Sequence, residues 1–159
     1  PTLQRDLVDF IFEVRRMGLL IKLDTNGGSP EVLETLISRR LIDYAALDIK
    51  APWSRYQEIC GTGADEKKVR MSLGILEHSG ISWEVRTTMC PSLEAQDVAA
   101  IARQLPPRVT LWRWNLYRKP EQFRIEDEPR VTAPALTHAE LEWLALQVRG
   151  SHHLMEVEL

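Results

Sequence analysis

The chain has 159 residues, of which 44% are hydrophobic and 27% charged, with a formal net charge of −3 and two cysteines. This length fits a single domain, 1–159, whose core needs no disulfide framework. The weak negative charge gives no electrostatic case for a nucleic acid or an anionic membrane as partner, and no apolar run approaches the ~20 residues of a membrane span. We therefore expect a cytoplasmic protein.

Helical and extended segments alternate along the sequence. Apolar residues at helical spacing predict a helix over 3–17, and a strand follows over 19–24. Ser29 before Pro30 is typical of a helix start, and this helix ends near Arg40. The remaining pattern predicts strands over 44–50, 83–88 and 109–116, helices over 66–78, 94–105 and 137–148, and a short strand or irregular end over 154–159. This alternation is typical of βα units with parallel strands.

Each predicted strand has one apolar and one polar face, because successive side chains point to opposite sides of a sheet. The polar faces carry, toward the carboxyl ends of the strands, Asp24, Asp48, Lys50, Arg86, Thr88 and Asn115. In a doubly wound sheet the strands usually read as continuous apolar runs. A partial βα barrel with helices outside and a polar lumen explains the alternation better, and such barrels carry their active site at the carboxyl ends of the strands. We expect these side chains to share a pocket, although each one is also compatible with an internal salt bridge.

The two carboxylates, together with Lys50 and Arg86, form a set of mixed charge. Such a set suits a zwitterion, and it equally suits a monovalent or divalent cation bound through carboxylate oxygens. No Ser-His-Asp or Cys-His arrangement is visible in the sequence. Cys60 and Cys90 lie in different loops and are interpreted as plain thiols, with Cys90 near the rim of the expected pocket.

Four short segments, in order and in spacing, resemble the motifs of radical S-adenosylmethionine activating enzymes. Pro1-Thr-Leu-Gln4 resembles the end of a Gly-Gly-Glu-Pro-Thr-Leu-Gln motif. Leu23-Asp-Thr-Asn-Gly27 and Leu47-Asp-Ile-Lys50 are similar to the next two motifs, and Glu84-Val-Arg-Thr-Thr88 is similar to the strand that follows. The subgroup that the sequence resembles is the activating protein of anaerobic ribonucleoside-triphosphate reductase, which is related to pyruvate formate-lyase activating enzyme.

The resemblance implies an α/β fold, a partial TIM-like (β/α)6 barrel, of which this chain would be the C-terminal two thirds, truncated at its N-terminus and lacking the first two strands. In that family a Cys-x-x-x-Cys-x-x-Cys loop binds a 4Fe–4S cluster, and S-adenosylmethionine binds the open iron of that cluster. An electron donor such as flavodoxin drives cleavage of the cofactor to a 5′-deoxyadenosyl radical, which generates a glycyl radical on the partner enzyme. The cysteine loop is absent here, and Cys60 and Cys90 do not replace it. We therefore expect this chain alone to lack the cluster and the activity.

The family's functional residues transfer to this sequence motif by motif. Asp24 and Lys50 resemble groups that contact the methionine part of the cofactor. A monovalent-cation site is implied at Asp24, Thr25, Asp48 and the backbone carbonyl of Ala46. The full set of implied cofactor-binding residues is Asp24, Thr25, Asn26, Asp48, Lys50, Arg86 and Asn115.

Two other functions fit the same residues. The first is a cluster-free βα-barrel lyase or isomerase that uses Lys50 as a Schiff-base or acid–base group. The second is a non-catalytic half-barrel that self-associates, because the strand over 19–24 would form an uncovered parallel edge of the sheet.

Overall fold

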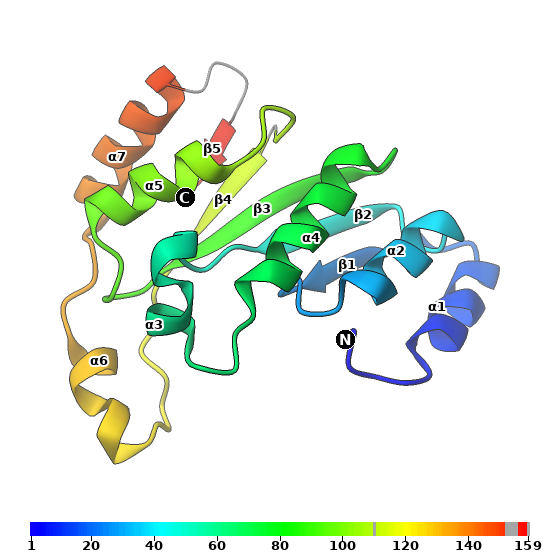
Figure 1. The fold of residues 1–159 in the computed structure, drawn as a ribbon, viewed down its shortest axis with the longest axis horizontal. Coiled ribbons are helices and arrows are strands. Elements are labelled where there is room, and N and C mark those ends of the chain that lie inside the picture. The colour runs from blue at the N-terminus through cyan, green and yellow to red at the C-terminus, as the bar shows by residue number, and fades with distance from the viewer. Residues whose placement is uncertain (110, 152–155, 159) are drawn as a thin grey trace.

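The computed structural model describes residues 1–109, 111–151 and 156–158 and contains a parallel sheet with the strand order β1-β2-β3-β4-β5 (Figure 1). The strands are β1 (Lys22–Thr25), β2 (Tyr44–Asp48), β3 (Ser82–Met89), β4 (Leu111–Leu116) and β5 (Glu156–Glu158). Each strand pairs in parallel with the next strand along the chain. Because crossovers between parallel strands are right-handed, this consecutive order places the connecting helices on one face of the sheet.

Helices alternate with these strands along most of the chain. They are α1 (Leu7–Arg16), α2 (Pro30–Ser38), α3 (Tyr56–Cys60), α4 (Glu66–His78), α5 (Ala95–Gln104), α6 (Glu128–Thr132) and α7 (His138–Ser151), with single 3-10 turns at Trp53–Arg55 and Ile125–Asp127. Figure 1 shows α2, α4 and α5 lying over the same side of the strands. The sheet is therefore singly wound, which is consistent with a partial barrel and excludes the doubly wound alternative for the described strands.

The core lies between the sheet and these helices. Leu47 and Val85 are fully buried there, and the rings of Trp112 and Trp114 meet edge to face at 5.1 Å between centroids. The buried hydroxyl of Thr87 donates to the Ile49 carbonyl at 2.6 Å and accepts from Trp112 Nε1 at 2.9 Å. This hydroxyl therefore has partners for both of its roles, as a buried polar group requires.

The turn after β1 depends on a glycine. Gly27 has φ +73°, and a Cβ there would lie 2.8 Å from Leu47 Cδ1 and 3.2 Å from the Cα of Val69 in α4. Ser72 Oγ, also in α4, donates to the Gly27 carbonyl at 2.9 Å. The turn and α4 are therefore locked together, which fixes the position of Asn26 beside them.

Most of the predicted elements are present, with differences at the short ones. The helix over 66–78 is α4, whereas the first helix begins at Leu7 instead of Leu3. The regions expected as loops contain α3 and α6, which have five residues each and are too short for an apolar period to reveal. The predicted end segment forms β5 over 156–158, and its residues 154, 155 and 159 lie outside the described ranges.

The predicted edge of the sheet is also present. Among the described strands, β1 pairs with β2 alone, and the preceding Leu19 and Leu20 are exposed. Over the part of the chain that the structure describes, no helix combines the length and the apolar character needed to cross a membrane.

Candidate functional site

The face of the sheet opposite the helices, here called the polar face, carries charged side chains from neighbouring strands. The parallel register places Asp24 level with Ala46 and Glu84, and Asp48 level with Arg86 and Arg113. Residues that are level on adjacent strands lie within reach of one another's side chains. The register therefore brings together charges that are far apart in the sequence.

Arg86 joins the two carboxylates that the sequence singled out. Its Nη1 donates to Asp24 Oδ2 at 2.7 Å, its Nε donates to Asp48 Oδ1 at 3.1 Å, and its Nη2 lies 3.1 Å from the same oxygen. Burial by itself lowers the pKa of Arg86, but the two carboxylates outweigh it and raise the pKa above its ordinary value. Asp24, Asp48 and Arg86, here called the Arg86 cluster, thus form an internal salt bridge, which was the alternative to a shared pocket.

A second group of charges surrounds Glu84, whose side chain is 2% exposed. Its carboxylate accepts from Lys22 Nζ at 2.8 Å and from the Tyr44 hydroxyl at 3.1 Å, and Arg113 Nε lies 3.7 Å away. The sequence placed Glu84 on the polar face but did not identify it as a centre of interactions. A signal was available in the strand pattern. Glu84 is level with Ala46 and Asp24, and Tyr44 and Lys22 stand two residues before them on the same face.

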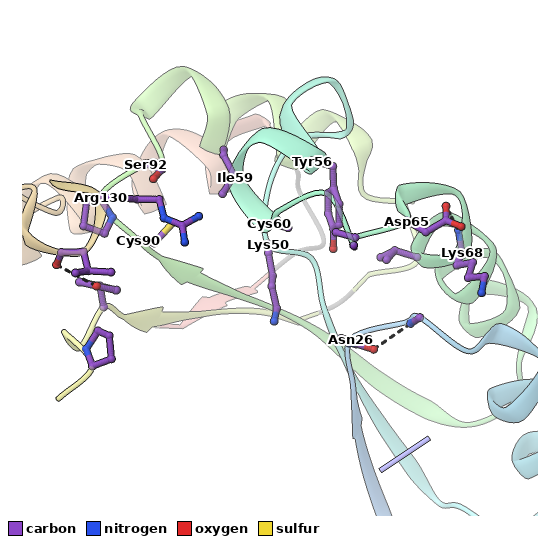
Figure 2. Close-up of a pocket in the computed structure, with 18 residues that line it drawn as sticks. Asn26, Lys50, Tyr56, Ile59, Cys60, Asp65, Lys68, Cys90, Ser92 and Arg130 are labelled. Atoms are coloured by element: carbon purple, nitrogen blue, oxygen red, sulfur yellow. Dashed lines mark hydrogen bonds between the residues drawn. The ribbon is translucent and has the colours of Figure 1, made fainter. Parts of the chain in front are cut away.

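A pocket of about 610 Å³ opens at the carboxyl ends of the strands (Figure 2). Residues that follow each of the first four strands line it: Asn26 after β1, Lys50 after β2, Cys90 after β3 and Tyr117 after β4. Side chains of α3, the start of α4 and α6 complete the wall, including Cys60, Lys68 and Arg130. A pocket is therefore present at this end of the strands, but of the six side chains expected to share it only Lys50 lines it.

The predicted site residues fall into three groups. Asn26 and Lys50 line the pocket, while Asp24, Asp48 and Arg86 form their cluster on the polar face. Ala46 is fully buried, and the side chain of Asn115 is exposed on β4 outside the pocket lining.

Thr25, an implied member of the cation site, lies on a different face from Asp24. It alternates with Asp24 along β1, so its side chain lies on the helix side of the sheet and is 4% exposed. Its hydroxyl accepts from the Gly27 amide at 3.1 Å. The side chain of Thr25 therefore stabilises the turn and does not lie on the polar face with the two carboxylates.

The pocket lining carries positive charge without full compensation. Within the described ranges, Lys50 and Lys68 have no ion-pair partner, whereas Arg130 pairs with Asp127 at 2.9 Å. The carboxylate of Asp65 caps α4 by accepting from the amides of Lys67 and Lys68. Among the described residues, Lys50 and Lys68 thus give the pocket positive charge that no ion pair offsets, beside the single carboxylate of Asp65.

Two thiols belong to the same lining, although the sequence placed them in separate loops. Cys60 and Cys90 are both half-buried. Burial raises the pKa of Cys60, the Lys50 charge acts in the opposite direction, and the neighbouring Cys90 adds to the rise. Sequence reasoning anticipated Cys90 near the pocket but not Cys60, because Cys60 reaches the pocket through the unpredicted α3.

Ionic and hydrogen bonds hold the α3 wall against α5. Arg55, just before α3, pairs with Asp97 of α5 and with Glu58 of α3. The Trp53 amide donates to the Gln104 side chain at 3.1 Å, which attaches the same segment to the other end of α5. The position of Cys60 therefore depends on contacts between residues about forty positions apart.

The residues present do not fit a 4Fe–4S cluster. The chain has two cysteines, and the family's cluster loop uses three thiolates. In the described parts of the chain, no group of three or more His, Cys, Asp or Glu side chains is arranged to hold a metal ion.

Comparisons with known proteins connect the chain to activating enzymes. No protein-family model matches it. It is 34% identical over 109 residues to a protein of Methanocaldococcus jannaschii named as a glycyl-radical enzyme activating enzyme. The match covers 65% of this chain and 45% of that relative, so the chain spans less than half of the relative's length.

The fold is shared with a solved structure. A domain of pyruvate-formate lyase-activating enzyme from Bacteroides vulgatus superposes with a TM-score of 0.72, over 96% of this chain and 89% of that chain. The sequence identity is 12%, so this likeness concerns the fold alone. It confirms the predicted α/β class and is consistent with a partial TIM-like barrel.

Proposed function

We propose that this chain is part of a radical S-adenosylmethionine enzyme that generates a glycyl radical on a partner enzyme. The observation that carries the proposal is the position of the motif residues Asn26 and Lys50, which line one pocket at the carboxyl ends of the strands. The 34% identity to a relative named as a glycyl-radical enzyme activating enzyme supports it. The shared fold with a domain of pyruvate-formate lyase-activating enzyme is consistent with it.

We also propose the finer points of this function. The partner is an anaerobic ribonucleoside-triphosphate reductase, the electron donor is of the flavodoxin type, and the reaction takes place in the cytoplasm. The order of the four motifs, from Pro1 to Thr88, supports this subgroup.

The pocket residues fit S-adenosylmethionine. A volume of about 610 Å³ lies within the roughly 300–1,000 Å³ of small-molecule sites. The unpaired ammonium of Lys50 would bind the cofactor's carboxylate, and the amide of Asn26 would orient the same end. Arg86 would position Asp24 and Asp48 beside this end, and Asn115 would contribute a polar group from β4. When bound, the cofactor supplies the 5′-deoxyadenosyl group for radical chemistry.

The monovalent-cation site belongs to the same proposal. Arg86 engages Oδ2 of Asp24 and Oδ1 of Asp48, which leaves the second oxygen of each carboxylate for a cation. The implied remaining ligands are Thr25 and the backbone carbonyl of Ala46. Since the side chain of Thr25 lies on the other side of the sheet, its contribution would have to come from its backbone.

Binding of the cofactor to the chain itself tests the proposal. Saturation-transfer NMR detects weak ligands, so S-adenosylmethionine can be titrated into the chain without a cluster. We expect the Kd obtained from the titration to rise about tenfold in Lys50→Met, since one charge-assisted hydrogen bond of about 1.4 kcal/mol is lost. Lys67→Met is the matched control, because Lys67 is exposed and lies outside the pocket lining. No binding to the wild type, or equal binding by Lys50→Met, would contradict the proposal.

The cluster provides a separate test. Anaerobic iron–sulfur reconstitution of the 159-residue chain should give no 4Fe–4S signal, because its two cysteines are one thiolate short. A stoichiometric cluster on this chain would overturn that conclusion.

A lysine-dependent lyase or isomerase is the second candidate, and one observation favours it. The Lys50 side chain faces the pocket and has no ion-pair partner among the described residues. Borohydride trapping with small keto acids separates the two functions. A covalent adduct on Lys50 would support the lyase, and its absence would count against it.

Self-association through the edge of the sheet is a further proposal for the partner. Phe10 and Met17 of the α1 region and Leu20 before β1 are 64%, 73% and 87% exposed. An uncovered parallel edge beside apolar side chains favours pairing with a second copy. Sedimentation of the wild type and of Leu20→Lys tests it, and a wild-type monomer at high concentration would contradict it.

A further inference from the structure

The pocket brings two thiols together with three cationic side chains. Cys60 is the last residue of α3, and Cys90 directly follows β3. Both are half-buried and both line the pocket, as do Lys50, Lys68 and Arg130. In Figure 2, Arg130 reaches into the same end of the pocket as Cys90. The thiols are therefore accessible through the cavity and not through a flat surface.

The charge of the lining selects the kind of molecule that can enter. Lys50 and Lys68 lack ion-pair partners in the described part of the chain, and the described lining holds three cationic side chains against one carboxylate, Asp65. A cavity whose lining has an excess of one sign of charge raises the local concentration of ions of the opposite sign. Small anions are thus concentrated beside the two thiols.

We propose that this pocket binds a small anionic disulfide and that Cys90 forms a mixed disulfide with it. The Cys90 thiolate attacks one sulfur of the disulfide, a new S–S bond forms, and the original S–S bond breaks. The other half leaves as a thiolate and takes up the proton that the Cys90 thiol has lost. Cys90 is oxidised and the small disulfide is reduced, so no further oxidant is needed.

Cys90 is the attacking residue because its surroundings in the pocket favour reaction more than those of Cys60. Cys90 is followed by Pro91 and Ser92, which also line the cavity, and Arg130 lies at its end of the pocket. Cys60 packs at the end of α3, and burial raises its pKa, which lowers the fraction of reactive thiolate at neutral pH. Cys60 is therefore the slower thiol.

This inference goes beyond the proposed function and does not depend on it. It needs neither S-adenosylmethionine nor a cluster, and it is measured as thiol reactivity. A failure of cofactor binding would leave it intact, and a failure of thiol exchange would leave the proposed function intact.

The test compares two chromogenic disulfides, the anionic dithiobis(nitrobenzoate) and the neutral dithiodipyridine, each normalised to its rate with a small free thiol. We expect the anionic reagent to react roughly tenfold faster than the neutral one on this scale, and the excess to fall at high salt. The Lys68→Gln/Arg130→Gln double variant should lose the excess, whereas Lys67→Gln should retain it. Equal normalised rates for the two reagents in the wild type would overturn the proposal.

The reacting residue is identified in the same experiment. Cys90→Ser should lose the fast phase, and Cys60→Ser should keep it. Peptide mapping of the wild type after one equivalent of the anionic reagent gives the same answer without a variant, so misfolding of Cys90→Ser does not obscure the result. A label found mainly on Cys60 would overturn the assignment.

Discussion

The Arg86 cluster and the pocket are neighbouring charged regions, and they differ in how their charges are matched. In the cluster, one guanidinium bridges two carboxylates at 2.7 and 3.1 Å. In the pocket, Lys50 and Lys68 have no ion-pair partner among the residues that the structure describes. Matched charges on strands hold the sheet together, whereas unmatched charges after the strand ends are available to a ligand. Whether a charged residue lies within a strand or after its end thus distinguishes a structural ion pair from a ligand-binding charge better than its residue type does.

Among the paired charges, removal of the buried Glu84 carboxylate should have the largest effect on the free energy of unfolding. Glu84→Ala leaves Lys22, Tyr44 and Arg113 without their shared partner, which we expect to lower the free energy of unfolding by about 2–3 kcal/mol. Urea denaturation measures the loss. Glu84→Gln is the control, because it keeps the volume and one acceptor and should lose less. A change below about 0.5 kcal/mol in Glu84→Ala would show that the polar face contributes little to stability.

The comparison itself is tested by removing one cation from each region. Arg86→Met leaves Asp24 and Asp48 without their bridging partner and should cost about 1.5 kcal/mol of unfolding free energy. Lys50→Met breaks no ion pair and should change the same quantity by less than about 0.5 kcal/mol. Equal losses in the two variants, measured by urea denaturation, would remove the distinction between matched and unmatched charges.

Acid should weaken the matched charges first. Burial raises the pKa of Glu84, but the hydrogen bonds from Lys22 and Tyr44, together with the nearby Arg113, outweigh it and leave the pKa below its ordinary value of 4.5. A lowered folded-state pKa means that the stabilisation is complete above pH 4.5 and is lost as the pH falls through the folded-state pKa. Urea denaturation below pH 4.5 should therefore show a steeper loss for the wild type than for Glu84→Gln. Parallel pH profiles would exclude Glu84 as a source of acid sensitivity.

The smallest expected effect concerns the wall of the pocket. Arg55→Gln removes the pairing with Asp97 that holds α3 against α5 and should loosen α3 locally. In a Cys90→Ser background, alkylation of Cys60 should then become severalfold faster, with little change in the midpoint of unfolding. Arg16→Gln is a control, since Arg16 pairs with Glu13 on the exposed side of α1. An unchanged alkylation rate would show that the ionic contact does not position α3.

The sequence predicts most helices and strands, and the polar residues at the carboxyl ends of the strands, because these features depend on residues close together in the chain. The apolar period identifies α4 over 66–78, and the two-residue alternation separates Leu47 from Asp48 and Val85 from Arg86. These signals lie within a few consecutive residues. The same pattern places Lys50 just after β2, and Lys50 lines the pocket.

The rest depends on contacts between distant segments. Whether Arg86 would face the cavity or bridge Asp24 and Asp48 is decided by a register over 62 positions in sequence. The presence of Cys60 and Cys90 in one pocket lining depends on α3, whose five residues are too few to show a helical period in the sequence. The implied cation site groups Asp24 and Thr25 by sequence, whereas the strand places their side chains on opposite faces, which only the folded backbone reveals.

The most direct test of the account is a residue-resolved map of S-adenosylmethionine binding by two-dimensional amide NMR of the isotope-labelled chain. We predict that the largest shifts occur at Asn26, Lys50 and the residues around Cys90, and that amides near Glu84 stay in place. Shifts that centre on Glu84 and Lys22, or no shifts at a saturating cofactor concentration, would contradict the assignment of the pocket as the binding region and of the charges around Glu84 as structural.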